Sequence, residues 1–223
     1  MQSQISRKSL IVGGIAGLAA SFMGAGAALA EPLTLEEAQK EIEQRLPGLL
    51  TDRAAELGLP ITFDDFSFAL TPELWGQYGG DTTALLSDVV AEYFGEGVEP
   101  KESAGPPVMV PFGTSVYKAR VWSGIPALGH GYVNQEVRAT VTSGKITSAS
   151  NVGPSWMSGA QIGTWSPAYT TLTRTKSNTR LKVQIKGQIY YVWKGVTLGG
   201  RQTFLTGFKV SGGKLVKTLY NDL

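Results

Sequence analysis

The spacing of hydrophobic positions along this chain changes near residue 107. Between residues 34 and 95, apolar side chains recur every three or four positions, which is typical of helices with one buried face. From residue 108 onward, apolar and polar side chains alternate over several stretches, which is typical of strands that bury one face. We therefore predict an α+β chain with a helical module over 31–96, a linker over 97–107 and an antiparallel β domain over 108–223.

Short polar motifs mark where the predicted helices begin and end. Thr34 and Glu37 form a capping box, in which each side chain bonds a backbone N–H of the first turn. Pro47 is expected to start a second short helix, and Gly58 to follow its end. Between the helices, the alternation over 61–68 is typical of a strand. Two more helices are expected after the capping side chains Thr71 and Asp81.

Turn residues divide the β domain into strands. Ser143–Gly144 and Gly212–Gly213 each separate two alternating stretches, which predicts two hairpins. The longest alternation, from Thr179 to Lys194, exceeds the usual strand of about five to six residues. It leaves two alternatives, a hairpin that turns at Lys186–Gly187 or one long strand with a bulge at Gly187. Several strands with such turns favour an antiparallel β-sandwich or a small barrel.

The charges of the chain are sorted by position. Residues 31–106 hold 16 acidic and 4 basic side chains, whereas residues 107–223 hold 2 acidic and 14 basic ones, so the net charges are −12 and +12. Such an asymmetry indicates a basic module and an acidic partner segment on one chain. We expect the acidic helical module to contact the basic domain as an intramolecular cover. The alternative for the acidic residues is an ordinary solvated helix face.

Six basic residues of the β domain have even numbers within their alternating stretches, so those on one strand point to the same face. If their strands lie in one sheet, they form a positive face that binds anionic polymers through many salt-sensitive contacts. The alternative is an ordinary basic surface, but such a surface normally mixes both signs of charge. The expected partner is an anionic polymer or a cell-wall glycan, and a membrane surface is a further possibility. The candidate binding residues are Lys118, Arg120, Arg138, Arg180, Lys182 and Lys186.

Two tryptophans complete the candidate binding site. Trp156 and Trp165 lie in the Gly-, Ser- and Pro-rich segment 153–167, which makes them the better candidates for a binding loop, while a core or interface position is the alternative. Exposed aromatic rings of this kind stack on sugars or bases. Parity places Tyr191 and Trp193 on the buried face of their strand instead.

Residues 1–30 have the pattern of a signal peptide. Arg7 and Lys8 precede an apolar stretch, and the small-x-small motif at 28–30 predicts cleavage after Ala30. A transmembrane anchor is the alternative, but glycines dilute the apolar stretch. The chain has no cysteine, which excludes disulfides, thiol catalysis and cysteine zinc sites. We therefore expect a secreted bacterial protein.

The sequence contains no motif of a known catalytic type. His130 is the single histidine, and a Ser–His–acid relay needs an acidic residue beside it, for which the β domain offers only Glu136 and Asp222. A lone histidine also makes a metal site unexpected, and no cofactor is expected. The leading hypothesis is a non-enzymatic protein that binds an anionic polymer or cell surface. Alternatives are a secreted hydrolase of extracellular polymers with a site at the module junction, and a toxin-like protein with an inhibitory propeptide.

Overall fold

The computed structural model describes residues 33–95, 108–109, 114–125, 129–159, 163–218 and 223, without the side chains of 108–109, 125 and 129–130. The predicted signal peptide, the linker over 97–107 and Asp222 lie outside these residues, as does the side chain of His130. Residues 33–223 form one compact unit. The domain boundaries expected from the sequence stay a prediction. In the described part of the chain, no helix is both long and apolar enough to span a membrane.

The first helix, α1 (Leu35–Glu56), is longer than predicted. Its N-terminus has the expected capping box between Thr34 and Glu37, but Pro47 lies inside the helix, so the prediction of a second helix from Pro47 is wrong. A proline in a helix costs about 3 kcal/mol, whereas a buried Leu or Ile contributes about 1.5–3 kcal/mol. Burial therefore outweighs the proline along a continuous apolar face formed by Ala38, Ile42, Leu46, Leu50 and Ala54.

Two shorter helices follow, and their caps are as predicted. In α2 (Pro72–Gln77), the Leu74 N–H donates to Thr71 Oγ1 at 3.3 Å. In α3 (Thr82–Phe94), Asp81 accepts from the second and third N–H groups of the first turn. These side chains satisfy N–H groups that have no partner inside a helix. The segment between α1 and α2 forms two short strands, β1 (Ile61–Phe63) and β2 (Ser67–Phe68).

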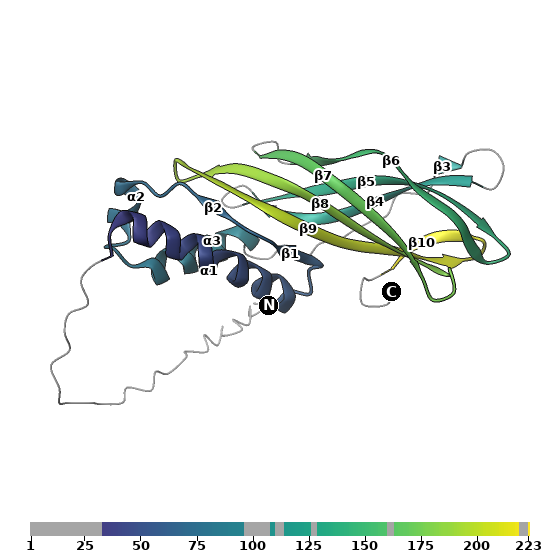
Figure 1. Cartoon of the computed structure of the whole chain (residues 1–223), viewed down its shortest axis with the longest axis horizontal. Coiled ribbons are helices and arrows are strands. Elements are labelled where there is room, and N and C mark those ends of the chain that lie inside the picture. The colour runs from purple at the N-terminus through teal and green to yellow at the C-terminus, as the bar shows by residue number, and fades with distance from the viewer. Residues whose placement is uncertain (1–32, 96–107, 110–113, 126–128, 160–162, 219–222) are drawn as a thin grey trace, which may run out of the picture. The chain divides into compact units, whose positions relative to one another are not determined.

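The remaining chain forms two antiparallel sheets, which are not closed into a barrel. The first sheet holds six strands, and β1 and β2 from the acidic half belong to it. Its other strands are β7 (Thr164–Thr175), β8 (Arg180–Trp193), β9 (Val196–Ser211) and β10 (Lys214–Thr218). The second sheet holds β3 (Val108–Met109), β4 (Thr114–Ile125), β5 (Gly129–Thr142) and β6 (Lys145–Gly159) in that order. The predicted α+β class is thus confirmed (Figure 1).

Both predicted hairpins are present. β5 turns into β6 at Ser143–Gly144, and β9 turns into β10 at Gly212–Gly213, and all four turn residues have positive φ. The long alternation is one unbroken strand, β8, so its residues do not form a hairpin at Gly187. The ring of Trp165, from the neighbouring strand β7, covers Gly187. A Cβ on Gly187 would overlap this ring. The glycine therefore makes room for an indole on the neighbouring strand.

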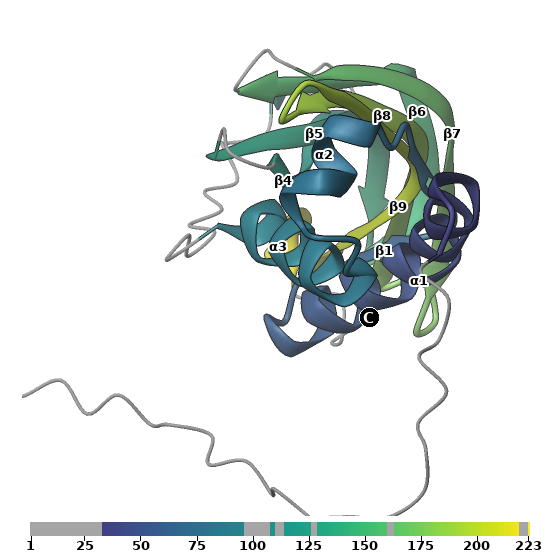
Figure 2. The ribbon, with the colours of Figure 1, turned by 90° about the vertical axis from the view of Figure 1, so that its left-hand side faces the viewer.

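The helices and both sheets share one hydrophobic core. β1 and β2 pair with residues of β9 between Leu198 and Phe204, and β10 pairs with Gly207–Ser211 of the same strand. Phe63 of β1 packs edge-on against Tyr93 of α3 at 5.3 Å, and Phe94 of α3 stacks on Trp122 of β4 at 6.2 Å. Helix α3 therefore contacts both sheets, and the helices lie across one end of the space between them (Figure 2).

Candidate functional site

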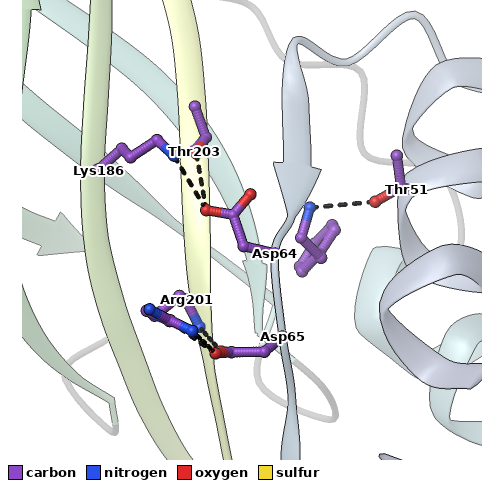
Figure 3. A network of polar contacts seen from close by, with 7 residues as sticks. Thr51, Asp64, Asp65, Lys186, Arg201 and Thr203 are labelled. Carbon is purple, nitrogen blue, oxygen red and sulfur yellow. Dashed lines mark hydrogen bonds and ion pairs between the residues drawn. The ribbon is translucent and has the colours of Figure 1, made fainter. Parts of the chain in front are cut away.

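The acidic half meets the basic half at the loop between β1 and β2. Asp64 accepts from Lys186 Nζ and from Thr203 Oγ1, each at 3.3 Å. Asp65 accepts from the backbone N–H of Arg201 at 2.9 Å and from its Nε at 2.6 Å. Figure 3 shows both carboxylates pointing from this loop toward β8 and β9. Two cations of the basic half thus have their counter-charges in the acidic half.

The electrostatics of this loop favour the charged forms of Asp65 and Lys186. Burial raises the pKa of Asp65, but hydrogen bonds and charge from Arg201 outweigh it and hold the pKa below its ordinary value. The hydrogen bond and the charge of Asp64 raise the pKa of Lys186. A general acid at neutral pH needs a raised carboxyl pKa. Asp65 is therefore suited to be a counter-charge rather than a proton donor.

A second contact between the halves lies at the turn between β8 and β9. Lys194 Nζ is 2.6 Å from Asp88 Oδ2 and 3.4 Å from Glu92 Oε1, both of α3. It also donates to the hydroxyl of Tyr78 at 3.0 Å. Together with Lys186–Asp64 and Arg201–Asp65, four ion pairs join the two halves among the described residues. Exposed ion pairs contribute little each, so the β pairing and the shared core hold the halves together.

The opposite end of the strands collects cations. The backbone N–H of Ile146 donates to Asn178 O at 2.8 Å, which joins the start of β6 to the β7–β8 turn. Arg180 lies directly opposite Lys209, which joins that turn to the β9–β10 hairpin. We call this region the distal basic end, because it lies away from the helices (Figure 1). Its members are Lys145, Arg174, Lys176, Arg180, Lys209 and Lys214.

Among the described residues from 108 onward, the one acidic side chain is that of Glu136, which lies on β5 opposite Lys118. The sequence has no Asp or Glu between residues 137 and 221. Like charges directly opposite on neighbouring strands, such as Arg180 and Lys209, are destabilising. Arg174 has backbone partners, since its NH1 donates to the carbonyls of Ile146 and Thr147 at 3.2 and 3.0 Å. The distal basic end is thus a concentration of positive charge.

The six basic residues singled out in the sequence lie in different sheets. Lys118, Arg120 and Arg138 are on β4 and β5 of one sheet, whereas Arg180, Lys182 and Lys186 are on β8 of the other. The condition that their strands lie in one sheet is therefore not met. Two cations of the second sheet make cation–π contacts. Lys118 Nζ lies 5.1 Å from the ring centre of Trp156, and the Arg120 guanidinium lies 4.6 Å from the ring centre of Tyr132. Their assignment as binding residues stays a prediction.

Trp156 and Trp165 lie on strands, so the prediction of a loop over 153–167 is wrong for its described residues. Trp156 belongs to β6 and Trp165 to β7, and both line one cavity of about 370 Å³. Trp165 packs edge-on against Phe204 at 5.7 Å, and its Nε1 donates to Ser155 Oγ at 3.1 Å. Gly153, Pro154 and Ser155 form a bulge within β6. Tyr191 and Trp193 are buried, as predicted.

Several residues of the site were not singled out by sequence pattern. Lys145, Lys209 and Lys214 flank the hairpin turns, and Asp64 and Asp65 reach the basic half only through the pairing of β1 with β9. The absence of acids between residues 137 and 221 is the signal that identifies the lysines. No sequence signal marks the partners of the two aspartates.

Comparison of the chain with protein-family models, with curated proteins and with solved structures finds no match. Within the part of the chain that the structure describes, no group of three or more His, Asp or Glu side chains is placed to hold a metal ion. A function for this protein is therefore inferred from the geometry and charge of the site.

Proposed function

We propose that this is an exported, non-enzymatic protein whose basic β region binds an anionic polymer or cell surface. The observation that carries the proposal is the distal basic end, where three hairpin turns bring cations together and the sequence has no acidic residue between residues 137 and 221. Several cations in one region attract a polyanion through release of its counterions. The like-charged pair Arg180 and Lys209 costs stability, which a bound anion offsets.

The acidic half acts in this proposal as a partial intramolecular cover. Asp64 and Asp65 hold Lys186 and Arg201 on the outer side of β8 and β9, whereas the distal basic end lies farther along the same strands. A polymer that approaches from the distal end meets the cations of the distal basic end first. It reaches Lys186 and Arg201 only by competing with the two aspartates. The finer description of the two sheets as a β-sandwich belongs to the same proposal.

The salt dependence of binding tests this function. The protein is titrated with heparin, teichoic acid and double-stranded DNA between about 50 and 200 mM salt. For DNA, each neutralised phosphate lowers the slope of log K against log salt by about 0.9, so four to six contacts give a slope of about −4 to −5. Failure to bind any of the three polymers at low salt, or binding that salt leaves unchanged, would contradict the proposal.

A further inference from the structure

The two sheets meet along a seam between their edge strands β6 and β7. In the described part of the chain, β6 pairs only with β5, and β7 only with β8. The pairing of each strand with its own sheet has a register shift, and the two shifts lie beside the same cavity. On β6, three residues over 153–155 lie opposite the single residue Gln135, and on β7 the pairing skips Ala168. Bulges of this kind bend edge strands and are frequent beside functional sites.

Side-chain hydrogen bonds join β6 to β7 beside these bulges. Asn151 Nδ2 donates to Thr170 O at 2.8 Å, and Trp165 Nε1 donates to Ser155 Oγ at 3.1 Å. Gln135 is 1% exposed, and it accepts from Thr170 Oγ1 at 2.8 Å while donating to Gly153 O at 3.1 Å. A buried amide with these partners fixes the bulge in place. These hydrogen bonds thus fix the positions of the two edge strands along the seam.

Two neighbouring cavities lie along the seam, and a third lies on the other side of β7, over β8 and β9. Their volumes are about 370, 280 and 240 Å³. The first and second share Ser155, and the second and third share the three residues of 167–169. A chain-like ligand can therefore follow one path from the cavity beside Trp156 and Trp165 to the cavity at Lys186. The first cavity lies within the range of about 300–1,000 Å³ that is usual for ligand sites, and the other two are smaller.

The chemistry of the lining changes along this path. Among the described residues, the first two cavities have only uncharged lining groups: tryptophan and tyrosine rings, hydroxyls, amides and the backbone of two edge strands. The third cavity has Lys186, Arg201 and Asp64. Tyr169 lies at the boundary, 58% exposed, with Lys186 Nζ 6.0 Å from its ring centre. A fitting ligand is rich in hydroxyl groups and carries widely spaced negative charge.

We infer that the seam binds an acidic polysaccharide, an inference that rests on the proposed function and specifies its ligand. Sugar hydroxyls pair with those hydroxyls and edge-strand backbone groups of the first two cavities that the seam hydrogen bonds do not use, and a sugar ring packs against Tyr169. A carboxylate or sulfate of the glycan takes the place of Asp64 at Lys186. A nucleic acid fits less well, because it carries one phosphate per nucleotide and two of the three cavities present no cation to it.

The test compares Tyr169→Ala with the matched control Tyr190→Ala. Tyr190 is an aromatic residue of the same type, 38% exposed on β8, and it does not line the three cavities. The probes are oligosaccharides of hyaluronan, alginate and polygalacturonate, together with double-stranded DNA. For at least one glycan, Tyr169→Ala is expected to weaken binding about fivefold to tenfold. Tyr190→Ala is expected to change it less than twofold, and neither variant to affect DNA.

Three outcomes separate the two proposals. If the two variants bind every glycan equally, or if DNA binds and no acidic glycan does, the seam inference is wrong while the proposed function stands. If neither the glycans nor DNA bind at low salt, the proposed function itself fails. Thermal unfolding of both variants and the behaviour of Tyr169→Phe, which keeps the ring, distinguish a lost contact from a lost fold.

Discussion

Replacing Arg180 and Lys209 together by glutamate is expected to weaken polyanion binding about a hundredfold at low salt. The two side chains lie directly opposite each other on β8 and β9 at the distal basic end. The double substitution removes two cations and adds two anions. The slope of log K against log salt should also fall in magnitude by about two. Titration of the protein with heparin or DNA at several salt concentrations measures both quantities.

A matched control makes the same change of net charge elsewhere. Lys40 and Arg53 are exposed on α1, and replacing both by glutamate costs only the exposed pair of Arg53 with Glu56. This variant is expected to bind within about threefold of the wild-type protein. Equal loss of affinity in both double variants would mean that net charge, rather than the distal basic end, governs binding.

The second large effect concerns the contact between α3 and β4. A Cβ at Gly124 would overlap the backbone carbonyl oxygen of Tyr93, and a backbone atom cannot move aside as a flexible side chain can. Gly124→Ala is therefore expected to lower the free energy of unfolding by about 3 kcal/mol. Urea denaturation followed by circular dichroism measures this change.

The control is the same substitution in an open position. A Cβ at Gly48, inside α1, meets nothing within 4 Å. Gly48→Ala is expected to stabilise the protein by about 0.5–1 kcal/mol, because alanine loses less backbone entropy than glycine in a helix. If Gly124→Ala proves as stable as the wild-type protein, the helices do not pack against the second sheet as described.

Local features of the fold were predictable from the sequence because their causes are local. The caps at Thr34, Thr71 and Asp81 depend on a side chain within three residues of the N–H groups that it satisfies. The Gly144 and Gly213 turns depend on backbone conformations that glycine adopts easily. Pro47 was misinterpreted because its local cost is outweighed by burial, which depends on distant elements.

The arrangement of the strands was not predictable in the same way. Parity shows which side chains of a strand share a face, but it does not show which strands share a sheet. For this reason Arg138 and Arg180 have the same pattern in the sequence and lie in different sheets. The pairing of β1 with β9 links residues that are far apart in the chain, and the contacts of Asp64 and Asp65 depend on it.

The charge asymmetry was the part of the candidate site that composition made visible. It predicted a basic region, and the structure gathers many of its cations in two groups: one paired with aspartates near the helices, one at the hairpin turns. Lys118, Arg120 and Arg138 lie apart from both groups, on the second sheet. The seam was less visible, because the segment around Trp156 and Trp165 has a loop-like composition although its described residues form strands. A bulged edge strand and a loop use the same residue types.

The location of a bound polyanion on the folded protein tests the central claim most directly. Nuclear magnetic resonance spectra of the ¹⁵N-labelled protein are recorded during titration with a short double-stranded DNA, which fits the seam less well than a glycan does, at low salt. We predict that the largest shifts of backbone amide signals occur at Ser177 and Asn178 of the β7–β8 turn and at Gly212 and Gly213 of the β9–β10 turn, while the signals of α1 stay in place. Shifts centred on the helices, or spread evenly over the whole protein, would contradict the account.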